Sequence, residues 1–162
     1  MKAVWMILNA AFLFLCASMY FGTGWSMVLF SFPLVPHLTP DNYYWVFVPE
    51  VSAAMTFFTW MASLMIVSSL VMIWMEWKTG IRWVPIVVLL CVLLSGGLTV
   101  WLIFPYNHQM AAGIKDPVQL QMILAKWTSL SRLRVGMWTV QWAAMMYYFG
   151  RLAWEAITPI EA

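Results

Sequence analysis

The chain has 162 residues, of which 64% are hydrophobic and 9% charged, and its formal net charge is +2. Because about a quarter of an average soluble domain is charged, this composition excludes a soluble globular domain. The small net charge and the lack of a basic tract give no basis for a nucleic-acid partner.

Four apolar runs follow one another along the chain, each long enough to cross a ~30 Å hydrocarbon core as a helix. They predict membrane spans at about residues 4–32, 51–77, 83–104 and 122–154. The first run is too long for the apolar region of a signal peptide, so we interpret it as a retained spanning helix. We therefore predict one all-α domain, residues 1–162, that forms a four-helix transmembrane bundle in the lipid bilayer.

The basic residues predict the orientation, since short loops rich in Lys and Arg stay in the cytoplasm. Four of them fall at one set of helix ends, namely Lys2, Lys78, Arg82 and Arg151. This distribution predicts cytoplasmic N and C termini and two longer outward-facing loops, residues 31–50 and 105–121. We expect a multi-pass protein of a bacterial inner membrane.

The segments between the spans carry signals for helix ends. The turn "EWKTGIRW" predicts an antiparallel hairpin of helices two and three, with Pro85 in the first turn of the latter. Four prolines predict an extended first outer loop, after which Glu50 begins helix two. Pro105 and Asn107 are expected to end helix three. Asp116 is expected to be the N-cap of helix four, followed by a proline at its first position.

Several abundant residue types have an ordinary structural interpretation. Six tryptophans near predicted helix ends indicate an interfacial belt: Trp5, Trp45, Trp77, Trp83, Trp101 and Trp154. The 14 methionines and the two cysteines, Cys16 and Cys91, are typical of packing residues. Small-residue patches around Gly22, Gly24 and Gly96 predict close approach between helices.

One side of the predicted fourth helix is unusually polar for a membrane span. Residues at steps of three and four share this side: Trp127, Ser131, Arg134, Trp138, Gln141, Met145 and Tyr148. Arg134 lies at the outer end of the most apolar part of this span, residues 135–154, where an unpaired guanidinium is costly. We expect it to contact Glu50, or the corner formed by Asn107 and His108.

The outer polar residues leave functional and structural interpretations open. Asn107 is either a C-cap or an inward-facing hydrogen-bonding group. His108, next to it, is a better functional candidate than the solvated His37. A metal site would need converging donors such as His37, His108, Glu50 and Asp41, and these are spread over separate segments, so we predict no metal.

Three stretches, "GTGWSMVLFSFPLV", "FPYNHQM" and "LAKWTSLSRLRVGMW", carry a family resemblance. Together they resemble a small four-helix membrane family of unknown function that includes the fungal anthrone oxygenases. The shared positions are Pro33, Pro105 with Asn107, and Trp127, Arg134 and Trp138. They follow the family pattern in order and spacing over most of the chain.

The resemblance implies oxygenation of an activated aromatic compound, an anthrone, without a metal or other cofactor. His108 would then act as the base, and Arg134 with Asn107 would stabilise an enolate oxygen. Tyr106, Trp127 and Trp138 would hold a flat substrate, with Glu50 at the same site. The substrate would be a hydrophobic or aromatic small molecule.

A second hypothesis belongs to a different class: an accessory, structural subunit of a larger membrane complex. Four spans with short loops leave nearly the whole surface free to pack against protein partners. We favour this hypothesis from the sequence, with the cofactor-independent anthrone-oxygenase-like enzyme as the alternative. An enclosed pocket among Asn107, His108 and Arg134 would favour the enzyme.

Overall fold

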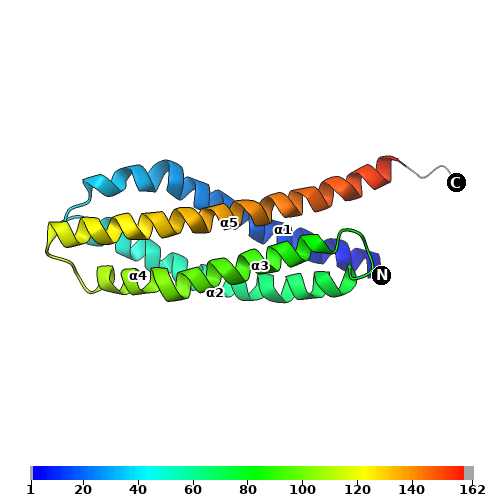
Figure 1. Ribbon diagram of the computed structural model, residues 1–162, viewed down its shortest axis with the longest axis horizontal. Helices are drawn as coiled ribbons and strands as arrows, with labels where there is room; N and C mark the ends of the chain where they lie inside the picture. The colour runs from blue at the N-terminus through cyan, green and yellow to red at the C-terminus, as the bar shows by residue number, and fades with distance from the viewer. Residues whose placement is uncertain (1, 159–162) are drawn as a thin grey trace.

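The computed structural model describes residues 2–158, which form an elongated all-helical bundle (Figure 1). Four helical rods make up the bundle. The first is α1 (Lys2–Ser26), extended by the π-helical η1 (Met27–Ser31) and the 3₁₀-helical η2 (Phe32–His37). The second is α2 (Tyr43–Met75). The third consists of α3 (Trp83–Leu98), the π-helical η3 (Thr99–Ile103) and α4 (Phe104–Ala111), and the fourth is α5 (Pro117–Ile157).

The connections between rods lie at the two ends of the bundle (Figure 1). The N-terminus, the turn 76–82 and the C-terminal part of α5 lie at one end, with the basic residues Lys78, Arg82 and Arg151. The segments 38–42 and 112–116 lie at the other. The predicted grouping of helix ends is therefore confirmed, as is the antiparallel α2–α3 hairpin. We call the first the basic end and the second the loop end.

The predicted start of α5 is also confirmed. The Asp116 side chain accepts a hydrogen bond from the Val118 backbone N–H at 2.9 Å, and Pro117 occupies the first turn. Aspartate at an N-cap satisfies one of the backbone donors that the first turn leaves free, and proline there loses no bond. α5 is consequently a single helix of 41 residues, about 60 Å long at ~1.5 Å per residue.

Two of the predicted helix limits are wrong. α2 begins at Tyr43 rather than at Glu50, and it contains Pro49. Helix three does not end at Pro105 and Asn107, because α4 continues the rod to Ala111. Neither proline ends its segment: Pro49 lies inside α2, and Pro105 lies in the first turn of α4.

Local geometry and packing explain these two continuations. Pro105 lies in the first turn of α4, directly after the π-helical η3, so the change of helical pitch accommodates the missing N–H. Pro49 is exposed, while Tyr43 and Phe47 on the buried side of α2 hold its first turns in the core. The turn out of α4 comes at Gly113, whose φ of +90° favours glycine.

The core consists of two clusters stacked along the bundle axis. The cluster nearer the basic end joins α1, α2, α3 and α5, and includes Leu13, Met65, Val88 and Met145. The cluster nearer the loop end is formed by η2, α2, η3, α4 and α5 around Trp127. The candidate site lies between these clusters, where the packing against α5 changes from α1 to η2 and α4.

Close approach of α1 to α5 depends on one predicted glycine. A Cβ atom on Gly24 would lie 2.8 Å from Trp138 Cε3 and 3.0 Å from Val135 Cγ2, closer than side chains tolerate. The expectation for this position is confirmed. Gly22 and Gly96 have open space where a Cβ would lie, so close approach at these two positions is wrong.

Three helical segments of the described chain are long and apolar enough to cross a membrane: Val4–His37, Tyr43–Met75 and Trp83–Ala111. α5 is long enough as well, but residues such as Lys126, Arg132 and Gln141 make it more polar. All six tryptophans predicted to form the belt are exposed on the bundle surface. These features indicate a multi-pass membrane protein.

Candidate functional site

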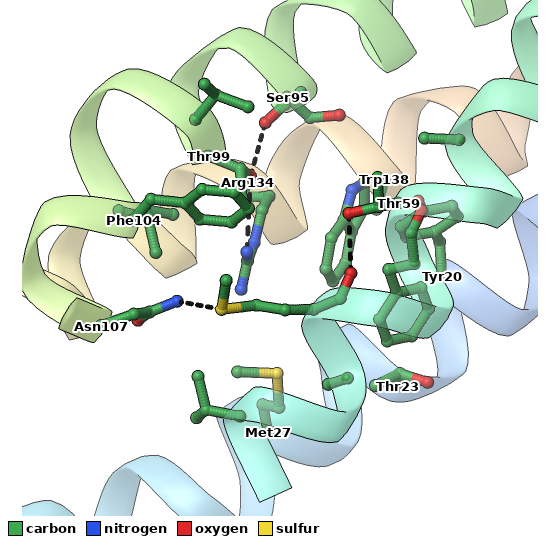
Figure 2. Close-up of a pocket in the computed structure, with 18 of the residues that line it drawn as sticks. Tyr20, Thr23, Met27, Thr59, Ser95, Thr99, Phe104, Asn107, Arg134 and Trp138 are labelled. Carbon is green, nitrogen blue, oxygen red and sulfur yellow. Dashed lines mark hydrogen bonds between the residues drawn. The ribbon is translucent and has the colours of Figure 1, made fainter. Parts of the chain in front are cut away.

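A cavity of about 280 Å³ is lined mostly by residues of α2 and the third rod (Figure 2). All four rods contribute to its walls. Most lining side chains are apolar, and the polar ones include Tyr20, Glu50, Thr59, Thr99, Asn107 and Arg134. Ligand sites in proteins combine a mostly apolar wall with a few placed polar groups, and this cavity has that character.

The polar side of α5 faces the bundle interior, as its spacing predicts. Trp127, Ser131, Trp138, Gln141, Met145 and Tyr148 are all buried, and Arg134 is half-buried. Three of these side chains line the cavity, namely Trp127, Arg134 and Trp138. α5 therefore supplies the back wall of the site.

Asn107 faces inward from α4 and connects three rods. Its Oδ1 accepts a hydrogen bond from Trp127 Nε1 at 2.8 Å, and its Nδ2 lies 3.1 Å from the Met55 sulfur (Figure 2). The Asn107 side chain is 8% exposed, and the Trp127 ring packs edge-on against Phe47. The expected approach of Asn107 to the Trp127 side of helix four is confirmed, although the residue lies within a helix rather than at a corner.

Arg134 points into the cavity between Asn107 and Trp138 (Figure 2). Its Cζ atom lies 4.8 Å from the centre of the Trp138 ring, a cation–π contact. Nη1 donates a long hydrogen bond of 3.4 Å to Thr99 Oγ1, whereas Nε is buried without any partner. The guanidinium is therefore held in place by an aromatic face and one weak bond.

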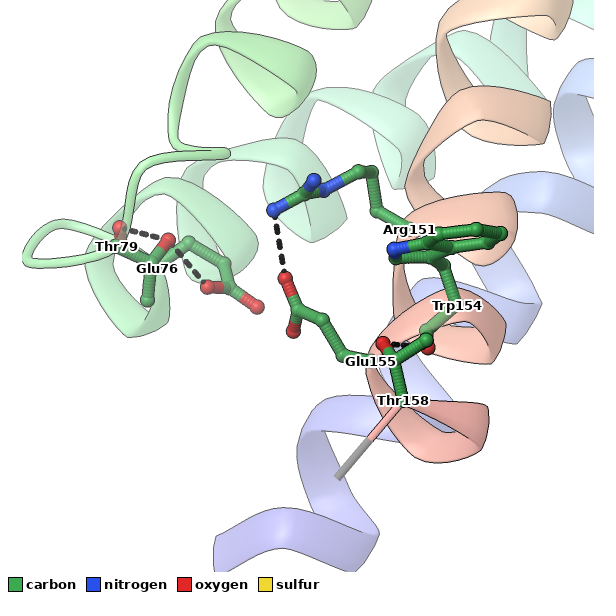
Figure 3. Close-up of polar contacts among 6 residues, drawn as sticks. All are labelled: Glu76, Thr79, Arg151, Trp154, Glu155 and Thr158. Carbon is green, nitrogen blue, oxygen red and sulfur yellow. Dashed lines mark hydrogen bonds and ion pairs between the residues drawn. The ribbon is translucent and has the colours of Figure 1, made fainter. Parts of the chain in front are cut away.

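The predicted ion pair between Arg134 and Glu50 is wrong. Both residues line the cavity, yet in residues 2–158 the one ion pair is Arg151–Glu155, at the basic end (Figure 3). Glu50 is exposed on the second turn of α2, so its carboxylate reaches solvent rather than the guanidinium. Arg134 thus has no acidic partner among the described residues.

His108 does not accompany Asn107 into the site. It is exposed, packs edge-on against Phe104 and does not line the cavity, so its expected orientation toward helix four is wrong. Successive residues of a helix point about 100° apart, and here Asn107 lies on the buried side of α4 and His108 on its exposed side. Tyr106 is half-buried against the loop-end core and is likewise outside the cavity lining.

Residues of α2 and α5 can be paired by their depth along the bundle axis, which shows what lies next to the cavity in the interior. The two helices run in the same direction (Figure 1), and Tyr148 of α5 donates a 2.7 Å hydrogen bond to Glu76 at the end of α2. Counting back by seven residues at a time gives the pairs Ser69 with Gln141, Ala62 with Arg134, and Met55 with Trp127. Side chains seven apart lie on one face of a helix, so these pairs share a depth.

The pair of Ser69 and Gln141, on the side of the cavity nearer the basic end, lacks hydrogen-bond partners. Gln141 and Ser69 are both 0% exposed, yet Gln141 Nε2 and Oε1 and Ser69 Oγ form no hydrogen bond within the described chain. Ser131 Oγ, nearer Arg134, is in the same condition. Buried polar groups are usually satisfied, so these unpartnered side chains stand out from the rest of the interior.

Glu76 is a buried polar residue that reasoning from the sequence did not select. It is 2% exposed, and its two carboxylate oxygens accept hydrogen bonds of 2.7 Å, one from Tyr148 and one from Thr79. Figure 3 shows the bond from Thr79. The signal available was its position in the α2–α3 turn, seven residues from the inward-facing Ser69. Because both of its oxygens accept hydrogen bonds, the Glu76 carboxylate has a structural role: it connects α2, the turn and α5.

No family model, curated protein or solved structure matches the chain. Within residues 2–158, no group of at least three His, Cys, Asp or Glu side chains is arranged to hold a metal ion.

Proposed function

We propose that this protein is a four-span membrane protein that binds a lipophilic small molecule in the cavity between α2 and the third rod. The observation that carries the proposal is the Arg134 guanidinium, which lies in an apolar cavity without an acidic partner. A charge in such surroundings is costly, and intramembrane ionisable residues are typically functional.

Exposed residues on two helices support a placement in the bilayer. Trp83 and Trp101 are both exposed and are separated by roughly 27 Å along the third rod, at ~1.5 Å per residue. Arg132 and Arg151 on α5 are separated by about 28 Å on the same basis. Both distances match the ~30 Å hydrocarbon core, so Arg134 lies just inside the boundary nearer the loop end.

The experiment tests whether the cavity holds a molecule in the purified protein. The full chain is purified in a mild detergent, extracted with organic solvent, and the extract is analysed by mass spectrometry. Ala62→Phe fills the cavity and should remove the bound compound, whereas Ala53→Phe, on an exposed position of the same helix, should retain it. Identical extracts from both variants would contradict the proposal.

An accessory subunit of a larger membrane complex is the second candidate. It is favoured by apolar side chains exposed near the loop end, beyond the boundary inferred above; Val118 is 67% exposed and Met122 is 58% exposed. Exposed apolar surface outside the bilayer is typical of a protein interface. Gentle purification followed by subunit identification separates the candidates, because an accessory subunit would co-purify with fixed partners at constant stoichiometry.

The anthrone-oxygenase-like chemistry has weaker support than binding alone. Tyr20, Phe58 and Trp138 form an aromatic wall that suits a flat ligand. A general base must reach the proton that it removes, however, and His108 lies outside the cavity. We therefore propose binding, without assigning a reaction.

A further inference from the structure

We propose that the ligand is a single-chain amphiphile with a carboxylate head group, which Arg134 binds and which enters from the bilayer between α2 and η3. This proposal rests on the proposed function and specifies the chemical class of its ligand.

The charge of the cavity favours an anionic head group. Arg134 is the one cationic residue in the lining, and Glu50, the one acidic residue there, forms no ion pair with it. Nη1 has only the 3.4 Å contact to Thr99, and neither Nε nor Nη2 donates to any residue in 2–158. The guanidinium thus retains donors for a ligand, and a planar carboxylate can accept two parallel bonds from it.

A carboxylate fits this site better than a phosphate. A phosphate monoester carries close to two negative charges at neutral pH and is usually bound by several cationic or backbone donors. Here Arg134 is the one cationic residue in the lining, so a second negative charge would have no partner. The single positive charge of Arg134 is matched by the single negative charge of a carboxylate ligand.

The walls and the opening favour a single apolar chain. Toward the basic end of the bundle the cavity is lined by Phe58, Ile66 and Val92, which offer an apolar surface beyond the guanidinium. The volume of about 280 Å³ is at the small end for ligand sites, so two acyl chains would not fit. Thr59 and Val100 line the cavity and are also exposed, so the chain can leave sideways between α2 and η3.

Competition binding tests this assignment. Radiolabelled oleate is bound to the purified full chain in a non-ionic detergent, and unlabelled oleate, methyl oleate and decylubiquinone are added as competitors. We expect oleate to compete at least about tenfold more effectively than its uncharged methyl ester, because a charge-assisted hydrogen bond exceeds a neutral one in strength. Equal competition by acid and ester would overturn the proposal.

Variants of two neighbouring arginines locate the effect. Arg134→Met should abolish the preference for the acid and Arg134→Lys should retain part of it, because lysine keeps the charge without the planar fork. Arg132→Met is the matched control, since Arg132 is exposed on the same helix and does not line the cavity. Retention of the full preference in Arg134→Met, or an equal loss in Arg132→Met, would overturn the proposal. If Arg134→Met fails to fold, the lysine variant and the acid-to-ester ratio of the natural chain decide.

The outcomes also separate this inference from the proposed function. Saturable binding in which methyl oleate or decylubiquinone equals oleate, and which Ala62→Phe removes, overturns the carboxylate head group and leaves a lipophilic site. Absence of saturable binding by all three compounds contradicts both proposals.

Discussion

Trp127 of α5 donates its indole N–H to Asn107 of α4 at 2.8 Å, and this bond fixes the wall of the cavity nearer the loop end. Both side chains are buried, and the Asn107 amide group also contacts Met55 of α2. One asparagine thereby sets the separation of three rods at the level where the cavity begins.

Loss of this bond should destabilise the bundle. Asn107→Ala leaves the Trp127 N–H without its partner, and an unsatisfied buried donor costs ~1–3 kcal/mol. We expect a fall of that size in the free energy of unfolding, measured by SDS titration in mixed micelles. His108→Ala is the control, since the neighbouring imidazole is exposed and forms no hydrogen bond to the described residues. Equal stability of both variants would show that the Asn107–Trp127 bond contributes nothing.

The contact between α1 and α5 gives a second prediction. Gly24→Ala would bring a Cβ to within 2.8 Å of Trp138, so overpacking should destabilise the protein by ~1–3 kcal/mol. Gly22→Ala, two residues away in open space, should instead be neutral or stabilising by up to ~1 kcal/mol, because alanine favours helix over glycine. Thermal unfolding midpoints in detergent should move in opposite directions. A midpoint for Gly24→Ala at or above that of the natural chain would contradict the close approach.

The buried side-chain amide of Gln141, which has no hydrogen-bond partner in the described chain, gives a third prediction. Gln141→Leu removes two unpaired polar atoms from a fully buried position and should leave stability unchanged or raise it by ~1–3 kcal/mol. Asn9→Leu is the matched comparison, because Asn9 of α1 exchanges hydrogen bonds with Ser68 of α2 at 2.9–3.0 Å. That change should destabilise. A stability loss in Gln141→Leu as large as in Asn9→Leu would mean that the amide has partners, such as bound water.

Orientation is tested by cysteine accessibility. In a chain with Cys16 and Cys91 replaced by alanine, Lys78→Cys should react only with a membrane-permeant thiol reagent in intact cells, because the basic end should face the cytoplasm. Thr39→Cys, in the opposite segment, should react with an impermeant reagent as well. The reverse pattern would invert the proposed topology.

Local signals in the sequence predicted much of the architecture. Asp116 and Pro117 mark the start of α5 because capping chemistry acts within one turn. The three- and four-residue spacing from Trp127 to Tyr148 identified the inward face of α5, since helical periodicity requires no knowledge of the neighbouring helices. Both predictions depend on contacts near in sequence.

The predictions from the sequence were wrong where contacts between residues far apart in the sequence determine the structure. Pro49 and Pro105 indicated helix ends, but the buried Tyr43 and Phe47 hold the start of α2 in the core, and the π-helical η3 accommodates Pro105. Which of Asn107 and His108 faces inward depends on the rotation of α4 about its axis. Because a corner at Pro105 was expected instead of a helix, this rotation could not be predicted. Arg134 was expected to contact Glu50 or the corner of Asn107 and His108, whereas its contacts come from Thr99 and Trp138.

A crystal structure of the full chain, purified from its own membrane in mild detergent, tests the central claim most directly. We predict density for a small molecule in the cavity between α2 and η3, with an oxygen atom of that molecule within hydrogen-bond distance of the Arg134 guanidinium. A cavity filled by protein side chains, with Arg134 paired to Glu50, would contradict the claim that this protein binds a ligand there.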